Sequence, residues 1–347
     1  MKRLSNIAAL LVLLFMAGSC IYDYPVSVPA GVTLDLHFKM DRPVANDNPV
    51  LAETDVTSDS HDIRYVIQAF RLLKNGKFSR EPAAEFIFSK DDISSLDNTV
   101  SIEIEEGTYR LYAWADYVPQ DSTEDHHFNT TDFTDLCLNC ETYHGNTDSK
   151  EAYVGSQVVE VIRYPEDVPV LYDTISLTHS LAKYNIVSND LQKFIRKMKS
   201  RKAAETKAGS DSEPEINLDD YLILVVYDQG LCYTSIDLHN DNMPIDGKFG
   251  LSYWSKINPI SETEALLGFD HIFIKPDQDK VNASVYVYDK DTTLITIAPV
   301  EIPVAKDSIH TLSDEILTYI KITGDEITGD SGISIDPNFE GDINIKL

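Results

Sequence analysis

Two cysteines lie at a spacing that could serve metal binding, thiol–disulfide exchange or a disulfide. Cys137 and Cys140 form the motif Cys-Leu-Asn-Cys. A zinc site would need two further ligands at matching spacing, and the nearby histidines His126, His127 and His144 do not supply it. A redox pair would need a thioredoxin-like βαβ context, which the surrounding sequence lacks. We therefore expect either a loop disulfide between Cys137 and Cys140 or two idle thiols.

Cys20 stands where a long apolar run ends. Lys2 and Arg3 precede the run, and the small residues Ala17, Gly18 and Ser19 follow it. A basic start, a short apolar stretch and a small-residue exit are the parts of a secretory signal peptide, whereas a membrane-spanning helix needs roughly 20 apolar residues. An ordinary signal peptide with an incidental cysteine is the alternative to a lipoprotein signal. We predict a lipoprotein signal peptide over 1–19 and acylation of Cys20.

Acylation would decide where the mature chain resides. A single acyl chain holds a protein only marginally, whereas two or more hold it firmly. A lipoprotein cysteine carries two or three such chains, palmitate among them. The sequence therefore predicts a lipid anchor at Cys20 and an extended tether over 20–30.

No motif in the sequence supports catalysis. The chain lacks the nucleophile elbow G-x-S-x-G, the P-loop, the dinucleotide fingerprint G-x-G-x-x-G and the zinc motif H-E-x-x-H. Residues 237–248 resemble a calcium loop, but Asn242 and Lys248 stand where an EF-hand needs Gly and Glu. A carboxylate pair for glycoside hydrolysis cannot be chosen among 57 acidic residues without a fold. We predict a protein that is not an enzyme, with no metal site and no cofactor.

The chain is strongly acidic, with a formal net charge of −28 at pH 7. An acid excess of this size repels nucleic acid and anionic lipid, so no nucleic-acid partner is expected. It is typical of a well-solvated surface outside the cytoplasm.

Alternating apolar and polar residues predict many short strands. Residues 31–40 alternate regularly, which indicates a half-buried strand. Asn75-Gly76 predicts a hairpin turn after a strand over 64–73. Residues 99–117 contain two strands around the turn Glu106-Gly107, and the second has bulky residues on both faces, which places it centrally in a sheet.

One helix is expected among the strands. Leu191, Phe194, Ile195 and Met198 follow the spacing i, i+3, i+4 and i+7 of one helical face. A capping box of Asn189 and Gln192 would begin this helix. The other face of this helix is basic and consists of Lys193, Arg196, Lys197, Lys199, Arg201 and Lys202. This face could be an ordinary solvated surface or a binding site for a partner.

The order of these elements indicates the architecture. Short strands at hairpin spacing, one main helix and no βαβ alternation predict a mainly β protein made of two β-sandwiches. Residues 118–150 are polar and look like a long surface excursion from the first sandwich. Two prolines interrupt the pattern at 163–169, so we place an N-terminal sandwich at 31–170 and a C-terminal sandwich with the helix at 171–347.

Several stretches together resemble the fimbrillin superfamily of the Bacteroidetes, the proteins of type V pili. "AGSC" (17–20) is similar to the lipobox used in that phylum, and "EEGTYRLYAWADY" (105–117) is similar to a strand of the superfamily. "LTHSLAKYNIVSNDLQKFI" (177–195) and "GISIDPNFEGDINIKL" (332–347) resemble the opening and the final strands of its second domain. The resemblance implies two tandem transthyretin-like antiparallel β-sandwiches.

The resemblance also implies a function. Subunits of that superfamily join by β-strand addition, which needs no catalytic residue. The expected partners are other fimbrillin subunits and a host or bacterial surface ligand, and the expected location is the outer membrane or the fimbrium at the cell surface. The final strand, with Ile343, Ile345 and Leu347 on its apolar face, is the candidate donor strand, and it could also fold back into its own domain.

The kind of subunit depends on the first strand. In the resembling superfamily, stalk subunits lose this strand to an arginine-specific protease. Here Arg42 is followed by Pro43, which usually blocks such cleavage, and Arg64 begins the next predicted strand. We therefore expect residues 31–40 to be retained, which favours an anchor or capping subunit over a repeating stalk subunit.

A second function remains open. The chain could be a glycan-binding surface lipoprotein of a polysaccharide-uptake system. In that case exposed aromatic residues such as Trp114 or Trp254 would form the sugar platform.

Overall fold

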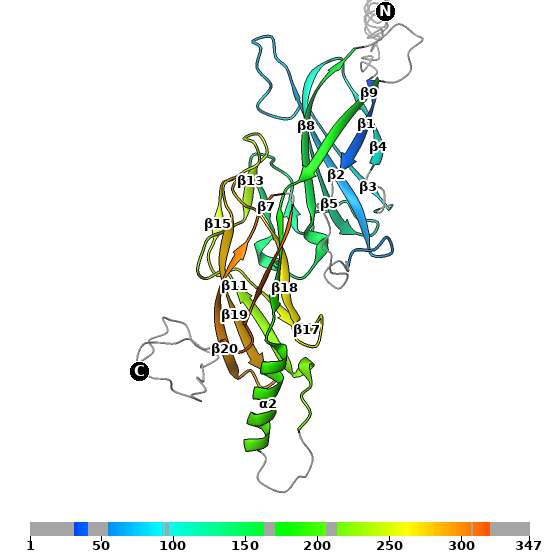
Figure 1. The fold of residues 1–347 in the computed structure, drawn as a ribbon. Helices are drawn as coiled ribbons and strands as arrows, with labels where there is room; N and C mark the ends of the chain where they lie inside the picture. The colour runs from blue at the N-terminus through cyan, green and yellow to red at the C-terminus, as the bar shows by residue number, and fades with distance from the viewer. Residues whose placement is uncertain are drawn as a thin grey trace, which may run out of the picture.

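The computed structural model describes residues 31–40, 55–91, 93, 97–162, 171–205, 214–306 and 308–319. It contains two β-rich bodies stacked along one long axis, with strand β1 (Val32–Met40) in one body and helix α2 (Leu191–Glu205) at the far end of the other (Figure 1). None of the helices formed by these residues has the length and apolar character needed to cross a membrane. The predicted signal peptide, Cys20, the tether and the candidate donor strand at 343–347 lie outside the described residues.

The first sandwich is a seven-stranded sheet with the order β3-β2-β5-β8-β9-β1-β4. Its strands are β1, β2 (His61–Arg71), β3 (Ala84–Lys90), β4 (Asp97–Ile104), β5 (Gly107–Pro119), β8 (Ala152–Val161) and β9 (Leu171–His179). β2 and β3 form the predicted hairpin, and Gly76 in its turn has φ of 77°, a value that favours glycine.

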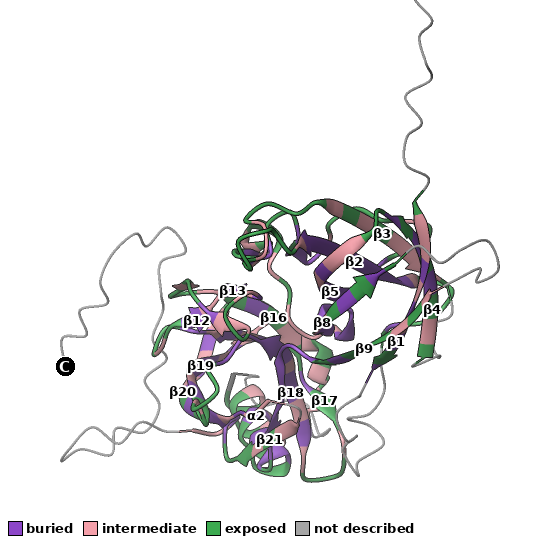
Figure 2. Ribbon diagram, turned by 90° about the horizontal axis from the view of Figure 1, so that it is seen from above, coloured by how far each residue is buried: buried purple, intermediate pink, exposed green. Residues whose placement is uncertain are grey.

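Strand β9 lets this single sheet curl into a sandwich. Its residues Leu171–Leu177 pair with β1 in parallel, and Thr178 and His179 pair with β8 in antiparallel fashion. The seven strands therefore curve around one interior (Figure 2), and one face of the sheet packs into a shared apolar core. Regular alternation accounts for this core, because every second residue of β1 and β4 is buried.

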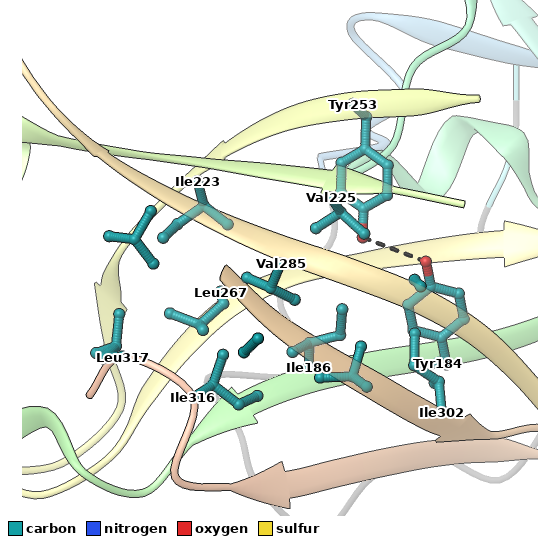
Figure 3. Packing of buried hydrophobic residues seen from close by; sticks show 14 of the residues in the cluster. Tyr184, Ile186, Ile223, Val225, Tyr253, Leu267, Val285, Ile302, Ile316 and Leu317 are labelled. Atoms are coloured by element: carbon teal, nitrogen blue, oxygen red, sulfur yellow. Dashed lines mark hydrogen bonds between the residues drawn. The ribbon is translucent and has the colours of Figure 1, made fainter. Parts of the chain in front are cut away.

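The second sandwich packs two four-stranded sheets face to face, with the orders β17-β18-β10-β21 and β16-β11-β19-β20. The strands are β10 (Ala182–Ser188), β11 (Tyr221–Val226), β16 (Ser252–Lys256), β17 (Asn258–Pro259), β18 (Ala265–Ile272), β19 (Lys280–Asp289), β20 (Leu294–Pro303) and β21 (Ile309–Asp314). Ile186 and Leu267 of one sheet meet Ile223 and Val285 of the other in the core (Figure 3). A mainly β protein of two sandwiches with one main helix is therefore confirmed.

Helix α2 closes one end of the second sandwich. Leu191, Phe194 and Met198 are buried in its core, as their spacing predicts. The helix begins one residue after Asp190, whose carbonyl accepts the first helical hydrogen bond, from the N–H of Phe194. The Asp190 carboxylate accepts hydrogen bonds from the N–H groups of Leu317 and Thr318, so it links the helix start to the chain after β21.

The polar segment between β5 and β8 is not a free surface excursion. It contains β6 (Phe128–Asn129), β7 (Leu136–Leu138) and the short 3-10 helices η2 (Cys140–Thr142) and η3 (Asp148–Lys150). β7 pairs with β13 (Ser235–Asp237), which pairs with β14 (Met243–Pro244), and this gives a four-stranded sheet shared by the two halves. A third apolar cluster, which includes Trp114, Phe128 and Phe273, lies beneath this sheet. The remaining short elements are β12 (Cys232–Tyr233), β15 (Gly247–Lys248) and η4 (Leu218–Asp220).

Two expectations differ from the structure. The expected second domain began at 171, but β9 completes the first sheet, so the division falls between His179 and Ala182. The two strands expected around the turn Glu106-Gly107 are present as β4 and β5, and β5 lies centrally between β2 and β8 as predicted. The sandwiches are not purely antiparallel, because β1 and β9 are parallel, as are β10 and β21.

Candidate functional site

Strand β1 is an interior strand of the first sheet. It lies between β4 and β9 and pairs with both along most of its length. Leu34, Leu36, Phe38 and Met40 point into the first core, with at most 2% of each residue exposed. Removing β1 would open a long apolar groove flanked by the unpaired edges of β4 and β9.

Arg64, the second candidate cleavage point, is buried. Only 1% of the residue is exposed, because its side chain is enclosed by Asp116 of β5 and by Thr123 and Asp125 of the segment that follows β5. Its guanidinium donates two hydrogen bonds to Asp116, at 2.9 and 2.7 Å, and one to Asp125 at 2.8 Å. A protease must bind an extended chain around the cleaved bond, so the folded sandwich protects this site. Arg42 lies outside the described residues.

The two sandwiches are joined by a buried ionic junction, which we define as Asp148 and Lys150 of η3, Lys183 of β10, and Asp270 and His271 of β18. Lys150 Nζ donates to Asp270 Oδ1 at 2.5 Å, and both side chains are 1% exposed or less. Two buried charges remain stable in a protein only when they are paired and hydrogen-bonded, because each loses its hydration. This pair therefore fixes η3 against β18.

A second charged group in the ionic junction is centred on Asp148. Its Oδ1 atom accepts hydrogen bonds from Lys183 Nζ at 2.5 Å and from His271 Nε2 at 3.1 Å. Burial alone would raise the pKa of the Asp148 carboxyl, but the hydrogen bonds from His271 and Lys183 and the positive charge of Lys183 outweigh it and lower the pKa to about 2. Burial lowers the pKa of His271, which keeps its imidazole neutral and able to donate from Nε2.

Tyrosine hydroxyls complete the environment of Asp270. Tyr143 and Tyr227 both donate to Asp270 Oδ2, the latter at 2.7 Å. Tyr227 also hydrogen-bonds to Tyr184, which in turn contacts Tyr253. Burial raises the pKa of Tyr184, Tyr227 and Tyr253 well above the usual value, so these hydroxyls stay protonated.

Two glycines allow close packing around Tyr253 of β16. Gly145 belongs to the segment between β5 and β8, which we call the linking segment, and Gly268 belongs to β18. A Cβ atom on Gly145 would lie 2.5 Å from the ring of Tyr253, and one on Gly268 would lie 3.1 Å from the same ring. The carbonyl of Trp254 accepts a hydrogen bond from Asn146 Nδ2 at 3.1 Å. The ionic junction and these contacts hold the two halves in one arrangement, which is a structural role rather than a chemical one.

The other sequence-predicted residues do not form a reactive site. Cys137 and Cys140 are free cysteines in this structure. A loop disulfide and a pair of idle thiols both stay predictions. His127 is buried, its Nε2 atom lies 2.7 Å from Ser149 Oγ, and burial together with the charges of His126 and Lys150 lowers its pKa to about 3. No group of three or more metal-ligating side chains occurs within the described ranges.

The two tryptophans differ sharply. Trp114 is fully buried under the shared sheet, so it cannot serve as a sugar platform. Trp254 is 58% exposed on β16.

Sequence reasoning missed the ionic junction. Asp148 and Lys150 belong to the polar segment that looked solvated, and no periodic pattern marks them. One feature of the sequence indicates a buried charge on β10. The strand is buried on both faces, and Lys183 is its only charged residue, so its ammonium needs a buried partner.

Solved structures similar to this chain include fimbrial proteins. The fimbrial anchor protein Mfa2 from Porphyromonas gingivalis is 11% identical, with coverage of 77% of this chain and 82% of that chain and a TM-score of 0.35. The tip fimbrial protein Mfa3 from the same organism, truncated at its C-terminus, is 11% identical, with coverage of 78% and 81% and a TM-score of 0.33. A candidate cell adhesion protein from Bacteroides eggerthii is 12% identical, with coverage of 83% and 88% and a TM-score of 0.40.

These fimbrial and cell adhesion proteins are what the chain is similar to among solved structures. At such identities and TM-scores they carry no conclusion about what this chain binds. No curated protein matches the chain. One family model matches residues 26–347, nearly the whole chain, and its description is a family of unknown function, DUF6562. The chain therefore belongs to the DUF6562 family.

Proposed function

We propose that this protein is a non-enzymatic subunit of a surface fimbria, placed at an end of the polymer as an anchor or capping component. The observation that carries the proposal is the position of β1. The strand pairs on both sides and its apolar face is buried in the first core, so the first sandwich is complete without a strand from a neighbour. A complete sandwich offers no groove for an incoming donor strand, and such a subunit ends a chain of subunits.

The burial of Arg64 supports the same role. Processing of stalk subunits in the resembling superfamily requires cleavage after an arginine that follows the first strand. Arg64 is held in a buried ion pair with Asp116, so cleavage there would require the first sandwich to open. The proposal therefore includes retention of β1 in the mature subunit.

The remaining parts of the proposal concern attachment and partners. Cys20 would carry the acyl chains that hold the protein on the outer membrane, and residues 20–30 would link the lipid to β1. Other fimbrillin subunits are the proposed partners, and cell adhesion is the proposed outcome. The strand with Ile343, Ile345 and Leu347 would either be donated to a neighbour or return to its own domain.

The test is mass spectrometry of the N-terminus of the protein recovered from purified surface fimbriae. We expect a chain that begins at acylated Cys20 and includes β1. A chain that begins at Pro43 or Tyr65 would show processing and make this a stalk-like subunit. A free amine on any other residue would exclude the lipid anchor, and absence of the protein from the fimbriae would exclude the fimbrial role.

A further inference from the structure

The outer face of the sheet β16-β11-β19-β20 carries a cluster of aromatic and apolar side chains, which we call the aromatic face. It consists of Trp254, Tyr286, Tyr288, Leu222 and Leu224. Trp254 is 58% exposed, and the other four residues are half-buried. Large exposed aromatic residues gathered on one face often mark a binding surface.

Strand register brings these residues together. Trp254 on β16 lies opposite Leu224 on β11, and Leu224 lies opposite Tyr286 on β19. Leu222 lies opposite Tyr288 in the same way. The aromatic face therefore spans three adjacent strands of a single sheet, and a ligand that lies across it would meet all five side chains.

The aromatic face is separate from the core of the sandwich. Tyr253 points inward, where its hydroxyl hydrogen-bonds to Tyr184, so its neighbour Trp254 must point outward (Figure 3). On β11, Ile223 and Val225 are fully buried in the core, while Leu222 and Leu224 alternate to the outer face. Core packing thus explains the inward residues and leaves the exposure of Trp254 unexplained.

The rings form a firm surface. The rings of Tyr286 and Tyr288 are nearly parallel, with centroids 6.4 Å apart and an interplanar angle of 10°. The Trp254 ring lies 5.8 Å from that of Tyr288, tilted by 52°. Asn146 binds the carbonyl of Trp254, which fixes this part of β16 to the linking segment. A pre-organised surface of this kind loses little conformational entropy when a ligand binds.

Polar groups at the edge of the aromatic face specify the ligand further. The Tyr286 hydroxyl donates to Asp228 Oδ2 at 3.1 Å, and Asp228 is exposed. Burial and the nearby Asp228 carboxylate raise the pKa of Tyr286 to about 12, so its hydroxyl keeps its proton at physiological pH. The site therefore offers apolar ring faces beside a carboxylate acceptor and a hydroxyl, which suits a ligand with an apolar face and many hydroxyl groups.

Charge excludes several ligand classes. Nucleobases also stack on aromatic rings, but the net charge of −28 repels a phosphate backbone and sulfated or carboxylated polymers. The exposed Lys256, opposite Leu222 on β11, is a cation beside the aromatic face, and the Asp219 carboxylate lies 4.0 Å from its ammonium. An uncharged ligand is not repelled by the protein and is therefore the class of ligand that fits the aromatic face. We propose that the aromatic face binds a neutral oligosaccharide, with sugar rings against Trp254 and Tyr288 and sugar hydroxyls bonded to Asp228. This proposal does not depend on the fimbrial role.

The test uses the full chain and the intrinsic fluorescence of its two tryptophans. Because Trp114 is fully buried, a ligand that changes the emission or protects it from acrylamide must act at Trp254. The probes are neutral oligosaccharides of glucose, mannose, galactose and N-acetylglucosamine, and a single-stranded oligodeoxynucleotide and dextran sulfate are the anionic comparisons. We expect at least one neutral oligosaccharide, and neither polyanion, to shift the emission in a saturable manner.

Variants locate the site. Trp254→Ala and Tyr288→Ala should each weaken binding by about tenfold or more, as measured by isothermal titration calorimetry, because each removes one stacking surface. Tyr172→Ala is the matched control, since Tyr172 is 78% exposed on β9 of the first sandwich, and it should bind as the unmodified chain does. Trp254→Phe keeps a ring and should retain part of the affinity.

Three outcomes would overturn the proposal. The first is that no neutral oligosaccharide binds, and the second is that Trp254→Ala binds as well as the unmodified chain. The third is that deletion of residues 320–347 changes the Trp254 emission whereas no oligosaccharide does, which would assign the aromatic face to the chain's own C-terminal segment.

Discussion

Lys150 and Asp270 lie 120 positions apart in sequence, yet they form an ion pair in which neither side chain is more than 1% exposed. Lys150 comes from the segment that links two strands of the first sandwich, and Asp270 comes from the second sandwich. This buried ion pair connects the two sandwiches. Separating the sandwiches would leave the Lys150 ammonium and the Asp270 carboxylate each without its partner.

Removal of one partner should therefore be costly. Asp270→Asn leaves the Lys150 ammonium buried without a carboxylate, and we expect a loss of about 3–5 kcal/mol in the free energy of unfolding. Urea denaturation followed by circular dichroism measures this loss. Glu301→Gln is the control, because it breaks the exposed pair of Lys280 and Glu301, which solvent screens, and should leave stability nearly unchanged. Equal losses in the two variants would contradict the assigned role of the pair.

Stability should decline as the pH falls below the usual histidine pKa. His127 has a pKa of about 3 in the folded state, whereas an unfolded histidine has one of about 6.5. Between these values the unfolded chain binds a proton that the folded chain does not, so the free energy of unfolding falls by up to about 1.4 kcal/mol per pH unit for this group. His127→Gln should flatten the profile in this window. Urea denaturation at a series of pH values measures the profile.

A second acid-sensitive step should follow at lower pH. The pKa of Asp148 is about 2 when folded and about 3.9 when unfolded, so its stabilising contribution is complete above about 3.9 and is lost as the pH falls toward 2. Asp148→Asn should lower stability at pH 7 and remove this lower step. A profile that keeps the lower step in the variant would assign it to other carboxylates.

Gly155 should tolerate no side chain. A Cβ atom there would lie 2.4 Å from the carbonyl oxygen of Ser176 on the neighbouring β9, and backbone cannot yield as a side chain can. We expect Gly155→Ala to cost about 1–3 kcal/mol, as overpacking usually does. Gly230→Ala is the matched control, because its nearest neighbour would be 3.6 Å away. Thermal unfolding of the two variants side by side decides the question.

An arginine-specific protease should distinguish two nearby sites. Arg80 is exposed in the connection between β2 and β3, whereas Arg64 is buried within β2. We expect limited digestion of the folded chain to cleave after Arg80 and to leave the bond after Arg64 intact, as read by mass spectrometry of the fragments. Early cleavage after Arg64 would remove the support that its burial gives to retention of β1.

Local patterns were sufficient to predict single elements. The alternation over 31–40, the Asn75-Gly76 turn and the helical spacing of Leu191, Phe194 and Met198 all correspond to observed structure. These features depend on neighbours within a few residues, where sterics and the period of burial act directly.

Long-range pairing could not be predicted in the same way. The residues of β9 and their close neighbours in sequence do not indicate that β9 pairs with β1. The prolines at 163–169 therefore led to a predicted domain boundary that lies one strand too early. The alternation of residues along β5 does not decide whether Trp114 is exposed or buried. Its burial depends on the shared sheet, which covers that face of β5. The ionic junction escaped detection because polar residues such as Lys150 are usually solvated, and only tertiary structure supplies a buried partner.

Among the described strands, the first and the last of each sandwich pair in parallel, and this has a mechanical consequence. A force that pulls Val32 and His179 in opposite directions acts along β1 and β9, so their hydrogen bonds are loaded together in shear. The same holds for β10 and β21 when Ala182 and Asp314 are pulled apart. A pair of strands loaded at one end peels open one bond at a time, whereas a sheared pair must break many bonds at once. Both sandwiches are thus oriented to withstand tension along the line that joins their ends.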